Sequence, residues 1–162
     1  MSGNKSIRGS VYGYIKKKYG ADPEFLWMRF PDDAVFRHED NRKWFGIIMA
    51  LPRYKLGISG TESVDILNLK IDDLLLADML ISRDGFFRAY HMSHRNWITV
   101  LLDGTVPKKE IFDLIDLSFR ATSSVMFASV SVTASSASLY SFGKSSEPVS
   151  FSAIMFGRSS GF

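Results

Sequence analysis

The sequence predicts an α+β domain with a mainly antiparallel sheet and helices packed on one side of it. Apolar residues repeat at helical spacing in the first and last parts of residues 1–122, and short apolar runs bounded by turn residues lie between them. Of the 162 residues, 46% are hydrophobic, which is enough for a core. We therefore expect one folded domain over residues 1–122, followed by a different kind of segment over residues 123–162.

Three segments have helical patterns. Residues 7–19 carry apolar side chains near helical spacing and end at Gly20, a residue suited to a helix C-terminus. Residues 73–81 follow Asp72, which predicts an N-cap at that position. Pro107 suits the first position of the last helix. That helix has one buried stripe, formed by Ile111, Leu114, Ile115 and Phe119.

The runs between these helices read as strands. Residues 34–37 and 43–51 flank a polar turn and predict a hairpin. The second of these runs is almost wholly apolar, which favours a central strand. Three further strands are predicted at residues 64–69, 86–91 and 97–102.

The composition changes after about Thr122. Residues 123–162 are rich in Ser, keep several Phe, and contain only three charged residues, Lys144, Glu147 and Arg158. We expect this Ser-rich, low-charge tail to be poorly ordered or atypical, and we assign no function to it. Residues 125–132 alternate like a strand, so the segment could instead add an edge strand, form a hairpin or remain an apolar, sticky tail. A shifted reading frame or an appended segment would each explain the composition.

The composition also limits the class of protein. The chain contains no Cys, which excludes disulfides and Cys-based zinc sites. The first residues lack the apolar core of a secretory signal, and no apolar run is long enough to span a membrane. We therefore expect a soluble, cytoplasmic protein. The formal net charge of +3 is only mildly basic and gives weak support to a nucleic-acid partner.

No residue pattern predicts catalysis or a bound metal. The chain has His38, His91 and His94, but no second cluster of ligand residues at a matching spacing. The acid pairs at 32–33 and 72–73 stand where Asp caps turns and helices. Nucleophile-elbow and phosphate-loop patterns are missing. We therefore expect no enzyme activity, no cofactor and no metal.

Basic and aromatic residues come closest to a functional pattern. They stand at the ends of the predicted strands, and their convergence would make one rim of the sheet cationic, with flat rings nearby. Nucleic acids favour such surfaces, because cations replace phosphate counterions and rings stack on bases. Trp residues at strand starts also fit a purely structural role in the core. The candidates for nucleic-acid binding are Lys43, Trp44, Arg53, Lys70, Tyr90, His91, His94, Arg95 and Trp97.

Four stretches, taken in order, resemble the MmcQ/YjbR family of small bacterial proteins. They are EFLWMRFPDDAVFRHEDNRKWFGIIM, VDILNLK, AYHMSHRNWITVLLDG and VPKKEIFDLIDLSF. Together they cover most of residues 24–120. The resemblance implies a fold similar to the frataxin/CyaY sandwich, described in that family as a double wing. It also implies DNA binding, the property with which the family is commonly labelled.

The resemblance transfers only matched positions, as candidates for a shared surface: Lys70, Tyr90, His91, Met92, Arg95 and Trp97. Residues 123–162 have no counterpart in it. Frataxins use an acidic ridge on a helix for iron, whereas residues 16–18 of the first helix here are all Lys. We therefore do not expect iron binding.

These observations predict a non-enzymatic DNA-binding protein. Lys43, Lys70, His94 and Arg95 would contact phosphates, while Trp44, Tyr90 or Trp97 would position them or stack on bases. The alternative is a protein-interaction or regulatory module that binds no nucleic acid, which fits the apolar composition and modest charge. A small-molecule or metal site around His91 and His94 is a third interpretation.

Overall fold

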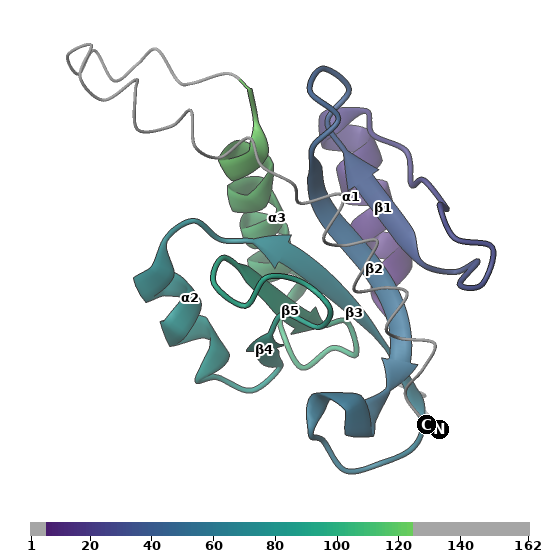
Figure 1. Cartoon of the computed structure of the whole chain (residues 1–162), viewed down its shortest axis with the longest axis vertical. Helices are drawn as coiled ribbons and strands as arrows, with labels where there is room; N and C mark the ends of the chain where they lie inside the picture. Colours follow the sequence, from purple (N-terminus) through teal and green to yellow (C-terminus); the bar gives the residue numbers. More distant parts are fainter. Residues whose placement is uncertain (1–5, 125–162) are drawn as a thin grey trace. The chain divides into compact units, whose positions relative to one another are not determined.

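The structure is a computed structural model and describes residues 6–124. Three α-helices and five strands follow one another in the order helix, hairpin, strand, helix, strand, strand, helix (Figure 1). Their bounds are α1 (Arg8–Tyr19), β1 (Ala34–Arg37), β2 (Trp44–Pro52), the short 3-10 helix η1 (Arg53–Leu56), β3 (Ser63–Lys70), α2 (Leu74–Ile81), β4 (Phe86–Arg88), β5 (Trp97–Leu101) and α3 (Lys108–Thr122).

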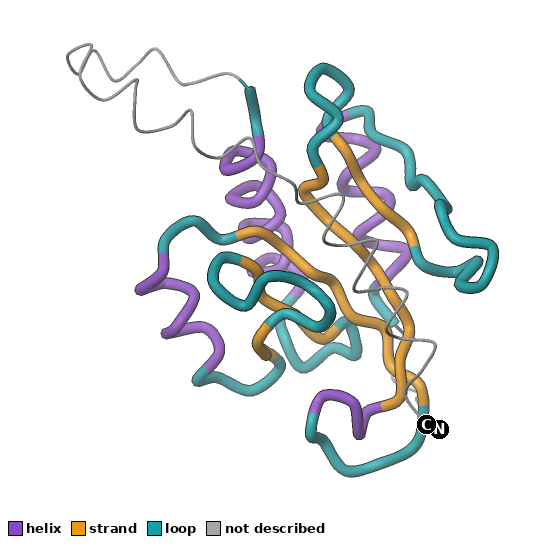
Figure 2. The backbone as a smooth tube through the Cα atoms, in the orientation of Figure 1, coloured by secondary structure: helices purple, strands orange, loops and turns teal. Residues whose placement is uncertain are grey.

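The five strands form one sheet in the order β1-β2-β3-β5-β4, and all neighbouring strands are antiparallel (Figure 2). The predicted hairpin is β1 and β2. Its register skips Phe45, because Phe36 pairs with Gly46 while Arg37 pairs with Trp44, which is a β-bulge. The apolar strand β2 lies between β1 and β3, as its composition predicts.

The helices contribute to one core with the sheet. α1 supplies Val11 and Ile15, and α2 supplies Ala77 and Leu80, to one cluster of buried side chains. From the predicted stripe of α3, Ile111, Leu114 and Ile115 belong to this cluster, and partly buried Phe119 packs against it. Figure 1 shows α1 and α3 behind the sheet. The strand residues of this cluster are Ala34, Phe36, Phe45, Ile48, Leu67, Leu69, Phe86, Ile98 and Val100. The predicted α+β class, with an antiparallel sheet and helices on one side, is confirmed.

Three predicted boundaries are wrong. The N-cap of α2 is Asp73 rather than Asp72, since the Asp73 carboxylate accepts hydrogen bonds from the amides of Leu75 and Leu76. β4 ends at Arg88 rather than residue 91, because His91 takes the left-handed conformation at φ +57°. Pro107 is the N-cap residue of α3 and not its first helical residue.

The alternative strand at residues 125–132 lies outside the described residues. The same holds for most of the tail predicted over residues 123–162, of which only Ser123 and Ser124 are described. The division at residue 122 therefore stays a prediction.

Candidate functional site

The strand register brings most of the predicted site residues to one end of the sheet. Trp44 begins β2, Lys70 ends β3, and Trp97 begins β5. Lys70 pairs directly with Trp97, and Gly46 pairs with Leu69 on the other side of β3. Lys43 precedes β2, and the loop 89–96 leads into β5. We call this end of the strands, with Lys43, Lys70 and loop 89–96, the basic end of the sheet.

Loop 89–96 is fixed to the sheet by a buried polar network. Asn68 on β3 and Thr99 on β5 are paired across the sheet and fully buried. The Thr99 hydroxyl donates to Asn68 Oδ1 (2.5 Å), and the Asn68 amide donates to the Tyr90 carbonyl (3.0 Å). The Tyr90 amide donates to Thr99 Oγ1 (2.9 Å). This closed network holds the start of the loop in one place, and buried Met92 anchors its middle.

The loop presents its candidate side chains at different depths. Tyr90 and His91 are half-buried, and their rings meet edge to face at a centroid distance of 4.1 Å. His94 and Arg95 are exposed. The left-handed backbone at His91 turns the chain away from the direction of β4. His94 and Arg95 therefore lie in the next turn of the loop, where both side chains are exposed.

Trp44 and Trp97 are core residues. Trp44 is 8% exposed, lies edge-on to Trp27 at 6.1 Å, and has the Arg37 guanidinium over its ring at 5.7 Å. Trp97 is 1% exposed. A base cannot stack on a ring face that is covered by protein, so the structural interpretation of both Trp residues is the one that the geometry favours.

The cations of the basic end differ in how far they are neutralised. Lys43 and Arg95 are exposed and form no ion pair with any described residue. The Lys70 side chain is only 12% exposed, with Nζ 3.9 Å from Asp72 Oδ1. Arg42, next to Lys43, is paired with Glu24 at 2.8 Å. The positive charge that faces solvent without a partner therefore comes mainly from Lys43 and Arg95.

Arg53 does not join this group, which corrects the expectation of a single rim. It follows Pro52, which pairs with Ser63 at the opposite end of β2, roughly 26 Å along the strand from Trp44. Arg53 Nη1 lies 3.3 Å from Asp103 Oδ2, and its Nε lies 3.9 Å from Glu62. Two carboxylates thus neutralise the cation.

The Arg53 side chain lines a 520 Å³ depression at that opposite end, together with Ser6, Glu62, Asp65 and Asp103. Burial disfavours the charged form of Asp103, but hydrogen bonds from Thr105 and Arg53 outweigh it and lower the pKa of this carboxyl. The depression is an internally paired polar site, in which the charges already have partners.

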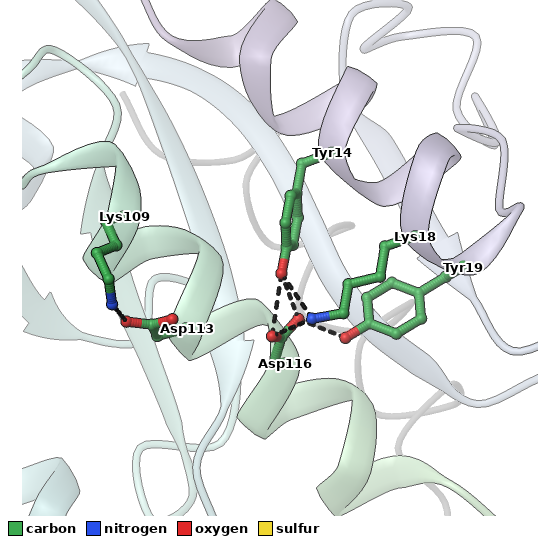
Figure 3. A network of polar contacts seen from close by, with 6 residues as sticks. All are labelled: Tyr14, Lys18, Tyr19, Lys109, Asp113 and Asp116. Carbon is green, nitrogen blue, oxygen red and sulfur yellow. Dashed lines mark hydrogen bonds and ion pairs between the residues drawn. The ribbon is translucent and has the colours of Figure 1, made fainter.

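A polar network that sequence patterns did not predict joins α1 to α3. Asp116 accepts hydrogen bonds from Tyr14 (2.8 Å), from Lys18 (2.5 Å) and from Tyr19 (Figure 3). Burial opposes the charge of Asp116, yet hydrogen bonds from Lys18, Tyr19 and Tyr14 lower the pKa of its carboxyl. Burial, reinforced by Asp116, raises the pKa of Tyr19. The network stabilises helix packing, since every member is engaged with another.

The three His residues have different surroundings. His38 is 4% exposed, and its Nε2 lies 2.8 Å from Thr122 Oγ1, whose hydroxyl donates to the Ser118 carbonyl. Burial lowers the pKa of His38, against the opposing effect of Asp40.

Within residues 6–124, no group of three or more His, Asp or Glu has a metal-binding arrangement. No described helix has the length and apolar character needed to cross a membrane.

The geometry defines an α+β protein with a five-stranded antiparallel sheet, helices over one face, and a loop-bearing basic end. Known proteins resemble this chain in both architecture and sequence. The family model described as YjbR matches residues 16–121, and the chain therefore belongs to the YjbR family. The predicted family resemblance is confirmed.

Individual relatives and solved structures support the same family membership. The chain is 38% identical over 115 residues to "Uncharacterized protein YyaQ" of Bacillus subtilis, covering 71% of this chain and 97% of YyaQ. A crystal structure of a Pseudomonas syringae protein is 44% identical with a TM-score of 0.69, covering 72% of this chain and 98% of that one. Protein DR2400 of Deinococcus radiodurans, with domain DUF419, shares the fold at 17% identity and TM-score 0.54, covering 74% and 80% of the two chains.

Proposed function

We propose that this YjbR-family protein binds nucleic acid, without catalysis, through the basic end of the sheet. Lys43 and Arg95 carry the proposal. They are 52 positions apart in sequence, yet both are exposed at the same end of one sheet and have no ionic partner among the described residues. Phosphates of the nucleic acid would serve as the ionic partners of these two cations.

The arrangement favours contact with the phosphate backbone over reading of bases. β2 and β5 flank β3, so two strand spacings, roughly 10 Å, separate the strand starts near Lys43 and Arg95. That separation allows each cation to contact a different phosphate. His94 and Lys70 would add to the local positive charge, whereas both candidate Trp rings are covered. The remaining candidate rings are those of Tyr90 and His91, which are half-buried, and of His94, which is exposed.

A binding titration tests the proposal. Fluorescence anisotropy of a labelled DNA duplex and of its single strand, at low salt, should show saturable binding of the full chain. The duplex should bind at least as well as the single strand, because phosphates and not base faces make the contact. The variant Lys43→Gln/Arg95→Gln should bind at least tenfold more weakly.

Lys55→Gln is the matched control. Lys55 is exposed on η1 at the opposite end of the sheet and has no ion pair with any described residue, so the substitution removes one positive charge elsewhere, as Lys43→Gln and Arg95→Gln each do at the basic end. Equal weakening by the control and by either basic-end substitution would show only a general charge effect. Absence of binding at low salt would refute the proposal outright.

A further inference from the structure

The helix α2 turns an apolar face to solvent. Leu75 and Met79 stand one helical turn apart and are 78% and 67% exposed, and Leu74 beside them is 45% exposed. The opposite face of the same helix places Ala77 and Leu80 in the core. Large apolar side chains grouped on one exposed face gain free energy when a partner covers them, and such a patch marks an interaction surface.

Acidic residues surround this face. Asp78 lies on the helix between the apolar side chains with 69% of its side chain exposed, and Asp72 before the helix is 57% exposed. Asp73 caps the helix, and exposed Asp84 follows it. We call Leu74, Leu75, Met79 and these four Asp the α2 surface.

Nearby cations offset only part of this negative charge. Arg88 and Lys70 each approach one of these carboxylates no closer than 3.9 Å. Arg83 is held by Glu110 at 2.5 Å, outside the α2 surface. The apolar face therefore has a net negative rim.

We propose that the α2 surface is a docking site for a basic amphipathic helix or peptide of a partner protein. Apolar side chains of the partner would cover Leu75 and Met79, and its Lys or Arg side chains would face Asp72 and Asp78. A second copy of this chain fits less well, because a two-fold contact would bring the same carboxylates together. The α2 surface adjoins the basic end at the Lys70–Asp72 contact, but it includes neither Lys43 nor Arg95 and does not depend on the proposed function.

Two synthetic helical peptides with the same Leu face test this proposal, one with Lys and one with Glu on the polar face. With the full chain, the Lys peptide should bind saturably and the Glu peptide at least tenfold more weakly. Leu75→Ser/Met79→Ser should weaken binding of the Lys peptide about tenfold, since two apolar contacts are lost. Asp78→Asn should weaken it a few-fold and make it less sensitive to salt.

Controls separate this surface from general stickiness. Met28→Ser removes a fully exposed apolar side chain elsewhere and should leave peptide binding unchanged. Lys43→Gln, at the basic end, should also leave it unchanged. Met79→Gln keeps side-chain length and helix propensity, so this variant should fold even if the double variant does not. It should still weaken binding of the Lys peptide, because it removes one apolar contact.

Three results would overturn the proposal. The first is equal binding of the Lys and Glu peptides, and the second is unaltered binding by the folded Leu75→Ser/Met79→Ser and Met79→Gln variants. The third is concentration-dependent self-association of the chain in sedimentation velocity that Met79→Gln abolishes, because a second copy would then be the occupant of the α2 surface.

Discussion

The hydroxyl of Thr99 donates a 2.5 Å hydrogen bond to the side-chain oxygen of Asn68, between two adjacent strands where neither side chain reaches solvent. The same hydroxyl accepts the backbone amide of Tyr90, and the Asn68 amide donates to the Tyr90 carbonyl. Two buried polar residues thereby position the loop that carries His94 and Arg95. Substitution of either residue should loosen loop 89–96 more than it loosens the sheet.

Thr99→Val should lower the free energy of unfolding by about 1–3 kcal/mol. The substitution keeps the volume but removes the hydroxyl that pairs with Asn68 Oδ1 and with the Tyr90 amide in a buried site. Urea unfolding measures the loss, and hydrogen exchange of amides in loop 89–96 should accelerate more than that of β2. Thr61→Val, at an exposed position, should change stability by less than about 0.5 kcal/mol. Equal losses for the two variants would contradict the anchoring role.

Asp116→Asn should destabilise the protein by about 1–2 kcal/mol at neutral pH. The lowered pKa of Asp116 means that its charged form stabilises the fold above the pKa of the unfolded chain, about 3.9. This stabilisation is lost as the pH falls through the lower folded-state pKa. The difference between wild type and variant, from urea unfolding between pH 7 and pH 3, should therefore shrink toward acid.

Asp113→Asn is the control for that series. Asp113 lies on the same helix and contacts Lys109 at 2.8 Å (Figure 3), but both side chains are mostly exposed. Solvent screening makes such an exposed pair contribute little to stability, so Asp113→Asn should cost much less than Asp116→Asn. A loss of stability for Asp113→Asn equal to that for Asp116→Asn would argue against the helix-joining network.

His38 should make the fold less stable as the pH falls below about 6.5. Burial lowers its pKa in the folded state, so the unfolded chain takes up a proton at a pH where the folded protein stays neutral. The free energy of unfolding then falls by at most about 1.4 kcal/mol per pH unit from this residue. His38→Gln should show a flatter pH profile between 7 and 5 than wild type in urea unfolding. Parallel profiles for wild type and His38→Gln would contradict this account.

Arg53→Gln should leave nucleic-acid affinity within about twofold of wild type at a given salt concentration. Arg53 already faces Asp103 and Glu62, and it lies at the far end of β2 from Lys43. A tenfold loss in the same anisotropy titration would place Arg53 in the contact surface after all and would require a binding face different from the basic end.

Strand and helix positions follow from the sequence because apolar spacing reports which side chains must leave water. β1, β2, β3 and β5 lie within one residue of their predicted bounds, and α1 begins one residue later than predicted. The site was harder to predict, although one error was avoidable. Lys43 and Arg53 flank the same strand, so an extended β2 must hold them at opposite ends.

Other features needed the tertiary structure. Adjacent Asp72 and Asp73 are equivalent as N-caps in sequence, and only the start of α2 selects Asp73. The burial of Trp44 depends on packing against Trp27 and the Arg37 guanidinium, which lie elsewhere in the sequence. Asn68 and Thr99 did leave a signal, since each is a polar residue inside an apolar strand, but their pairing depends on the strand order.

The most direct test of the basic end is the salt dependence of DNA binding. For wild type and Lys43→Gln/Arg95→Gln, the logarithm of the association constant is measured against the logarithm of the salt concentration. Removal of two phosphate contacts should reduce the steepness of this line by about 1.8, while Lys55→Gln leaves it unchanged. Lines of equal slope for wild type and the double variant, or no measurable wild-type binding, would contradict the assignment of Lys43 and Arg95 to a phosphate-binding surface.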